Sequence, residues 1–180
     1  MAAAPMFGGL PLAHAPIASI PALTHYSDRA TPHVYSVGQN PRPHFKPLGL
    51  WVSIDAGSVS WPDYIESSDS WAHRLRVIHD VHLAPDARIL LLATVEDFDA
   101  FAGQYGRSER TAPPGYHYYI DWKAVAEAYQ GIVIAPYRYD RRLDGGLWYY
   151  GWDCASGCIW DADAIAAITV RSPASAGAVV

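Results

Sequence analysis

Short apolar runs separated by polar turns predict a chain with more strands than helices. The clearest strand spans residues 74–83, where Leu75, Val77, Val81 and Leu83 alternate with polar side chains, as expected when one face of a strand is buried. Further strands are predicted after Gly49 and at 22–26, 88–93, 132–137, 147–152 and 158–160, with 31–37 as a weak strand or an extended loop.

Three short helices are predicted between these strands. Segment 61–71 has a proline in its first turn, where the missing backbone N–H costs nothing. Thr94 caps a helix that runs to about residue 105, and Asp121 caps another that Gly131 ends. Because these helices are short and scattered among the strands, the order favours a single α+β domain over a doubly wound parallel sheet.

The composition excludes several classes of function. The 180 residues are 51% hydrophobic and 13% aromatic, which supports one domain with a substantial core. The net charge is −5, so unspecific attraction to a polyanion is not the main role of the surface. Arg138, Arg141 and Arg142 form the one evident basic cluster, for which a solvated loop is the simpler interpretation. Cys154 and Cys158 form no disulfide framework and lack the further ligands of a zinc site, which favours reduced thiols.

The ends of the chain differ in composition from its middle. Residues 1–21 are rich in Ala and Pro and predict a flexible or loosely docked arm, 22–170 the folded domain, and 171–180 a disordered tail. The arm lacks a basic start and is interrupted by prolines, unlike a secretory signal, and no apolar run is long enough to span a bilayer. We therefore expect a cytoplasmic protein with no membrane contact.

The segment 46–64 combines glycine, small hydroxyl residues and aromatic rings. Gly49 precedes a short apolar strand and lets the backbone approach a ligand closely, while Trp51 and Trp61 offer flat faces to a planar ring. These features predict the floor of a ligand pocket. The alternative is a buried strand and a polar turn with two tryptophans in the core.

Motifs of the common nucleotide-dependent and hydrolytic enzymes are missing, including a phosphate-binding glycine loop, a nucleophile elbow and a His-Glu-x-x-His helix. Instead, short motifs occur in a characteristic order: 23–27, 49–52, 58–61, 129–134 and 158–165. Together they resemble the ADP-ribosyltransferases of the diphtheria-toxin and poly(ADP-ribose) polymerase type. This resemblance implies a split β-sheet core with short peripheral helices, and NAD as the substrate.

The resemblance also implies roles for individual residues. His25, followed by Tyr26 where the family often has Gly, would bind a ribose. Trp51 and Trp61 would hold nicotinamide between them, which is physically sensible because π faces attract a cationic ring. Ser58 would bond the carboxamide. The implied NAD-binding residues are His25, Tyr26, Gly49, Trp51, Ser53, Ser58 and Trp61.

The catalytic position departs from the family pattern. The family's catalytic Glu opens the last core strand, and alignment on Ile165 puts Ser156 there, with Asp153 three residues earlier. RES-type toxins, which are relatives that consume NAD, use a Ser on this strand. The resemblance therefore implies an enzyme that cleaves the nicotinamide–ribose bond and passes ADP-ribose to an unidentified protein, nucleic-acid acceptor or water. The alternatives are a module that binds NAD or ADP-ribose without chemistry, and an interaction domain whose aromatic residues form the core.

Overall fold

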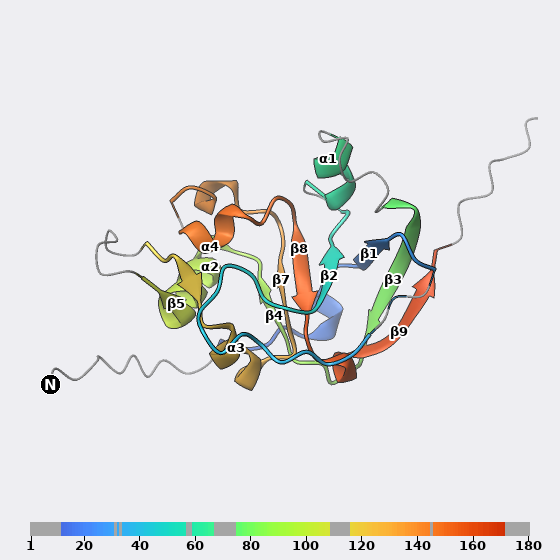
Figure 1. The fold of residues 1–180 in the computed structure, drawn as a ribbon, viewed down its shortest axis with the longest axis horizontal. Coiled ribbons are helices and arrows are strands. Elements are labelled where there is room, and N and C mark those ends of the chain that lie inside the picture. The colour runs from blue at the N-terminus through green and yellow to red at the C-terminus, as the bar shows by residue number, and fades with distance from the viewer. Residues whose placement is uncertain are drawn as a thin grey trace, which may run out of the picture.

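The chain folds as an α+β domain on a mixed seven-stranded sheet, shown in Figure 1. The computed structural model describes residues 12–30, 32, 34–56, 59–66, 75–108, 116–144 and 146–171. The strands are β1 (Leu23–Ser27), β2 (Leu50–Ser53), β3 (Val77–Leu83), β4 (Ile89–Leu92), β5 (Gly106–Arg107), β6 (Tyr119–Ile120), β7 (Gly131–Ile134), β8 (Ser156–Ile159) and β9 (Ile165–Val170). The α-helices are α1 (Trp61–Glu66), α2 (Val95–Tyr105), α3 (Trp122–Ala128) and α4 (Leu147–Tyr150).

The sheet is continuous but is weakly joined in its middle. Its order is β4-β7-β8-β2-β1-β3-β9, with β4 and β7 parallel and the other neighbours antiparallel. The β1–β3 register holds five residue pairs and the β2–β8 register four, whereas β1 and β2 share only Thr24↔Ser53. In Figure 1, β1, β3 and β9 accordingly lie to one side of β2, β8, β7 and β4. The sheet comes close to dividing between β1 and β2.

The helix starts confirm two of the predicted caps. Thr94 Oγ1 accepts a hydrogen bond from Asp97 N at 3.1 Å, and Asp97 Oδ2 accepts one from Thr94 N at 2.9 Å, which is a complete capping box. Asp121 Oδ1 accepts from Ala124 N at 3.2 Å at the start of α3. The prediction that Gly131 ends this helix is wrong. The helix α3 ends at Ala128, and Gly131 is the first residue of β7.

The prediction of a strand at 147–152 is wrong. Leu147–Tyr150 forms α4, and Trp148 and Tyr149 are fully buried. The ring of Trp148 stacks on Phe98 of α2 with centroids 5.1 Å apart, and Tyr149 meets the same ring edge-on at 4.8 Å. A short aromatic run carries no decisive period, so packing against α2 decides its conformation.

Further differences lie near the ends of the domain. β9 was not predicted, since its alanines show no alternation, yet it pairs with β3 along most of its length. Residues 34–37 form a loop, which is one of the two alternatives predicted for 31–37. Residues 12–21, assigned to the arm, contact the core: Ala15 N donates to Ile89 O at 3.0 Å, and Tyr129 Oη donates to Leu12 O. Residues 1–11, 67–74 and 172–180 lie outside the described part of the chain.

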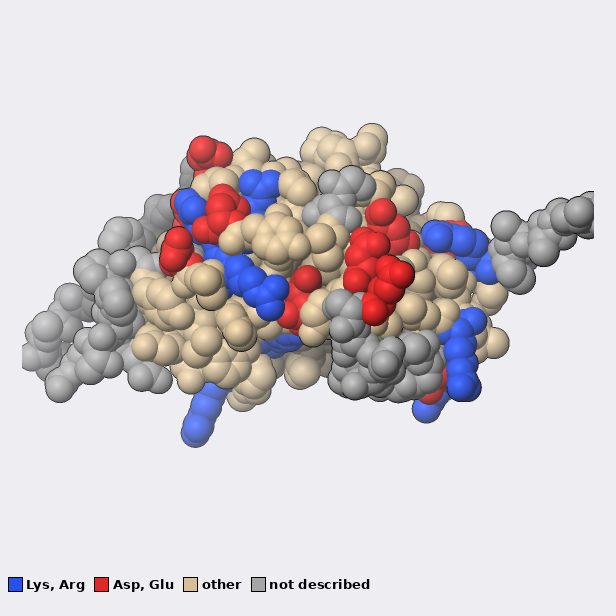
Figure 2. Space-filling view, turned by 90° about the horizontal axis from the view of Figure 1, so that it is seen from above, with Lys and Arg blue, Asp and Glu red and all other residues tan. Residues whose placement is uncertain are grey.

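The described surface carries both signs of charge. On the face in Figure 2, basic and acidic side chains are interspersed, and an acidic group lies to the right of centre. This agrees with the absence of a basic run from the sequence. None of the helices in the described ranges has the length and hydropathy to cross a membrane.

Candidate functional site

A cavity of about 420 Å³ lies where β1 and β2 separate. This volume is within the range of small-ligand sites. Its wall is formed by Thr24, His25, Tyr26, Lys46, Gly49, Leu50, Trp51, Val52, Ser53, Trp61, Trp152, Asp153, Cys154 and Ser156. All the site residues predicted from the sequence are in this set except Ser58, which lies outside the described residues. Four separate stretches of the chain therefore meet at one cavity.

His25 joins the two halves of the sheet through its side chain. Its Nδ1 lies 2.8 Å from Trp51 O, and because a carbonyl only accepts, Nδ1 carries the proton. Burial holds the pKa of His25 below its usual value of 6.5; the hydrogen bond to Trp51 opposes this, and the electrostatic effect of His79 adds to it. The neutral imidazole therefore keeps Nε2 as a hydrogen-bond acceptor.

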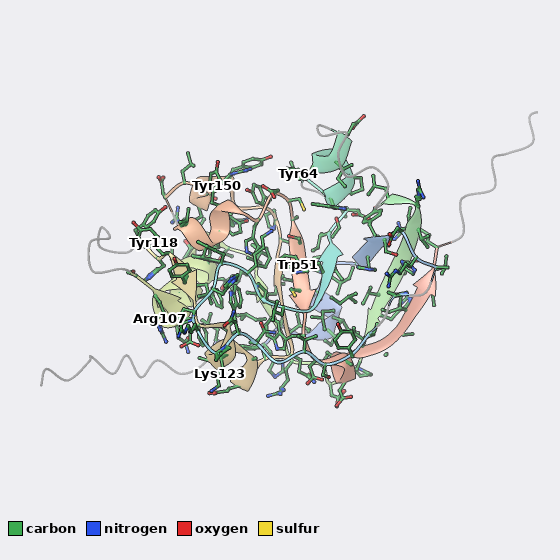
Figure 3. The ribbon with its side chains drawn as sticks, viewed as in Figure 1. Trp51, Tyr64, Arg107, Tyr118, Lys123 and Tyr150 are labelled. Carbon is green, nitrogen blue, oxygen red and sulfur yellow. The ribbon has the colours of Figure 1, made fainter. Side chains whose placement is uncertain are left out.

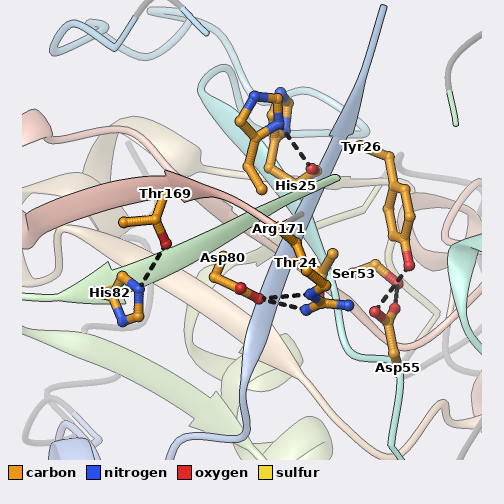
Figure 4. Close-up of polar contacts among 10 residues, drawn as sticks. Thr24, His25, Tyr26, Ser53, Asp55, Asp80, His82, Thr169 and Arg171 are labelled. Atoms are coloured by element: carbon orange, nitrogen blue, oxygen red, sulfur yellow. Dashed lines mark hydrogen bonds and ion pairs between the residues drawn. The ribbon is translucent and has the colours of Figure 1, made fainter. Parts of the chain in front are cut away.

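Tyr26, Ser53 and Asp55 form a hydrogen-bonded side of the cavity (Figure 4). Tyr26 Oη donates to Asp55 Oδ2 at 2.9 Å, and Ser53 Oγ donates to Asp55 Oδ1 at 2.8 Å. Ser53 Oγ also accepts from Trp61 N at 3.0 Å, which fixes the start of α1. Burial and the Asp55 carboxylate raise the pKa of Tyr26, so its phenol stays protonated. Ser53 thus positions Trp61, and its hydroxyl proton is already engaged.

The two predicted aromatic faces both line the cavity. Trp51 meets Trp152 with ring centroids 4.9 Å apart at 61°, while Trp61 stacks on Tyr64 at 5.5 Å and 27°. Among the ring contacts of the described residues, Trp51 and Trp61 do not pair with each other. Lys46 Nζ lies 5.0 Å from the Trp51 ring centroid, so this π face already holds a cation. Figure 3 places Trp51 on β2 in the middle of the molecule, with Tyr64 above it.

Asp153 and Ser156 lie at the cavity in different electrostatic settings. Asp153 Oδ1 accepts from Arg142 Nη2 at 3.2 Å, and among the described lining residues Asp153 supplies the only carboxylate. Ser156 is opposite Ser53 on β2, and its Oγ donates to Cys154 O at 2.9 Å. With its proton engaged, the Ser156 hydroxyl offers only lone pairs to a ligand.

The two cysteines form no disulfide with each other, as predicted. Cys154 and Cys158 are both free and buried. Burial raises the pKa of Cys154 to about 12 and also raises that of Cys158, so both stay neutral thiols. No group of three or more His, Cys, Asp or Glu residues in the described ranges is arranged to hold a metal ion.

Gly49 is required for a reason other than the predicted one. Its φ is +152°, and a Cβ there would lie 2.4 Å from Ile159 O. The close approach that glycine permits is therefore to the backbone of β8, although Gly49 also lines the cavity. Its role is to join β2 to β8 under the site.

The sequence did not single out Lys46 and Trp152, which line the cavity, or Arg142, which pairs with a lining residue. Lys46 lies in the segment that was read as the pocket floor and is one of only two lysines in the chain. A positively charged side chain in that segment was a signal from which Lys46 could have been identified. Trp152 was assigned to a strand, and Arg142 to a solvated loop. Only the fold places Arg142 beside Asp153.

Comparison of the chain with protein-family models, with characterised proteins and with solved structures gave no significant match.

Proposed function

We propose that this cavity binds NAD and that the protein is an ADP-ribosyltransferase or NAD glycohydrolase with the split-sheet fold of that family. The observation that carries the proposal is the convergence of His25, Trp51, Trp61, Asp153 and Ser156 on one cavity. Cleavage of the nicotinamide–ribose bond needs aromatic faces for a planar cation, acceptors for ribose hydroxyls and negative charge near the sugar. The single residue pair between β1 and β2 supports the split-sheet architecture.

The proposed reaction assigns one task to each group. Nicotinamide leaves with the electron pair of its bond to the ribose, and positive charge develops on the sugar as in glycoside cleavage. The Asp153 carboxylate stabilises this charge, and Ser156 Oγ accepts a hydrogen bond from a ribose hydroxyl. His25 Nε2 orients the second ribose. The acceptor nucleophile, from a macromolecule or water, then bonds to the sugar and loses its proton to solvent water.

Incubation with NAD tests the enzyme directly. We expect nicotinamide release detected by mass spectrometry, in step with NAD loss, because the cavity holds the groups that bond cleavage needs. Free ADP-ribose as co-product indicates hydrolysis, and a mass increase on an added protein or nucleic acid indicates transfer. Heat-denatured protein is the control. Absence of nicotinamide with every acceptor tried would contradict the enzyme.

A binding module without chemistry is the second candidate. Asp153 is one methylene shorter than the family's Glu, and its carboxylate is already engaged by Arg142. A ligand present at a hundredfold its Kd stabilises a protein by about 2.7 kcal/mol, which raises the melting temperature. A raised melting temperature without turnover would select this candidate. An unchanged melting temperature with no turnover would exclude both.

The pH dependence of NAD binding tests the role of His25. Burial lowers its pKa below the usual 6.5, so protonation, which removes the Nε2 acceptor, is centred below pH 6.5. We expect the NAD affinity measured by titration calorimetry to be constant at neutral pH and to fall as the pH is lowered through the pKa of His25. His25→Asn should bind more weakly and lack the acid limb, whereas His82→Ala, at an exposed position on β3, should keep it. An acid limb that persists in His25→Asn would assign the titration to another group.

A further inference from the structure

Lys46 is a cation in the cavity wall, and the proposed reaction gives it no role. We infer that its ammonium group is the site of a phosphate or diphosphate group of the ligand. The inference deepens the proposed function, on which it rests only for the identity of the molecule that carries the diphosphate.

The charges around Lys46 leave room for an anion. Within the described residues, no carboxylate forms an ion pair with Lys46 Nζ, because Asp153 is engaged by Arg142 at 3.2 Å. Lys46 and Asp153 are the charged side chains among the described lining residues, and Asp153 already has Arg142 as its partner, so the ammonium has no ion-pair partner of its own. The neighbouring thiols, Cys154 and Cys158, are neutral and do not balance it.

The backbone and one ring hold the lysine in place. Its Nζ lies 5.0 Å from the Trp51 ring centroid. On another side, a Cβ added at Gly151 would lie 3.2 Å from Lys46 Cε and 3.8 Å from Nζ. The absence of a side chain at Gly151 therefore leaves space for the end of Lys46. An ammonium held in this way is suited to a compact anion such as phosphate.

The pKa of Lys46 agrees with an anion site at its ammonium group. Burial lowers the pKa of Lys46, and the negative charge of Asp153 opposes this effect. A bound anion would add favourable interaction with the charged ammonium and restore the pKa. Elsewhere in the wall, Tyr26 and Ser53 are bonded to the Asp55 carboxylate.

Lys46 and Trp61 belong to different stretches of the cavity wall, and this separation can orient a ligand. A molecule with a cationic ring at one end and a diphosphate further along matches it. With Lys46 over Trp51, the ring end lies toward Trp61 and the diphosphate toward Lys46. This order is compatible with a ribose beside Asp153 and Ser156.

Amine labelling of the wild-type protein tests the site without relying on turnover. The chain has two lysines, and Lys123, exposed on α3 away from Trp51 in Figure 3, is an internal control. An N-hydroxysuccinimide ester with peptide mapping reports both in one sample. We expect inorganic pyrophosphate and ADP-ribose to slow labelling of Lys46 several-fold, with Lys123 unchanged and neutral nicotinamide without effect. Equal labelling of Lys46 with and without both anions overturns the inference.

Two variants separate the charge of Lys46 from its placement. Loss of one charge-assisted hydrogen bond predicts about 10-fold weaker ADP-ribose binding in Lys46→Met. Gly151→Ala, which retains the charge but crowds Cε, should also weaken it, whereas Lys123→Met should not. Tighter or unchanged ADP-ribose binding by Lys46→Met would contradict the inference.

The labelling and turnover experiments can fail separately. NAD cleavage without protection of Lys46 would reject the anion site alone. Protection of Lys46 by pyrophosphate without binding or cleavage of NAD would reject the proposed function and keep the anion site. Comparing the protection by pyrophosphate with that by ADP-ribose shows whether the diphosphate must belong to a nucleotide.

Discussion

Replacing Asp153 with Asn is expected to slow nicotinamide release about 100-fold with little change in the KM for NAD. The substitution keeps the shape of the side chain and removes the only carboxylate among the described cavity-lining residues. In the proposed reaction, charge on the sugar develops in the transition state, so its stabilisation should affect kcat more than binding. Steady-state measurement of nicotinamide release gives kcat and KM separately.

A matched variant controls for the loss of an ion pair. Asp99 also pairs with an arginine, Arg141, at 2.7 Å, and it does not line the cavity. Asp99→Asn should leave kcat unchanged. Ser156→Ala removes a hydrogen-bond acceptor but no charge, and we expect a smaller loss than for Asp153→Asn. A larger loss in Ser156→Ala would move the main catalytic role to Ser156, and normal kcat in Asp153→Asn would remove Asp153 from the mechanism.

Replacing Gly49 with Ala is expected to lower the free energy of unfolding by about 3 kcal/mol. The φ of +152° disfavours a side chain, and the new Cβ would meet Ile159 O at 2.4 Å, which only a backbone shift relieves. Urea unfolding followed by circular dichroism measures the change. Because Gly49 joins β2 to β8 under the cavity, any folded fraction should also bind NAD more weakly.

Gly103 supplies a control in which alanine is expected to raise, not lower, the free energy of unfolding. It lies in α2, and nothing is within 4 Å of a Cβ added there. Gly103→Ala is therefore expected to stabilise the protein by roughly 0.5–1 kcal/mol, because alanine loses less backbone entropy in a helix. Equal stability of Gly49→Ala and the wild type would show that the β2–β8 junction adapts without cost.

Local chemistry was enough to predict the elements whose signals lie within a few residues. The capping box at Thr94 and Asp97 and the cap at Asp121 need no information from elsewhere in the chain. The alternation at 74–83 likewise indicated β3 because one face of that strand is buried. The caps depend on local hydrogen bonds, and the alternation depends on the burial of one face of the strand.

The sequence by itself also pointed to the correct wall of the cavity, since glycine and aromatic residues were concentrated in segment 46–64. Only the tertiary structure decided the rest. The packing of Trp148 on Phe98 made 147–150 helical, and the fold brought Arg142 to Asp153 and Lys46 to Trp51. These contacts join residues that are distant in the chain or whose local pattern is ambiguous. Their energies depend on burial and on the neighbouring charge, which a single stretch of sequence does not contain.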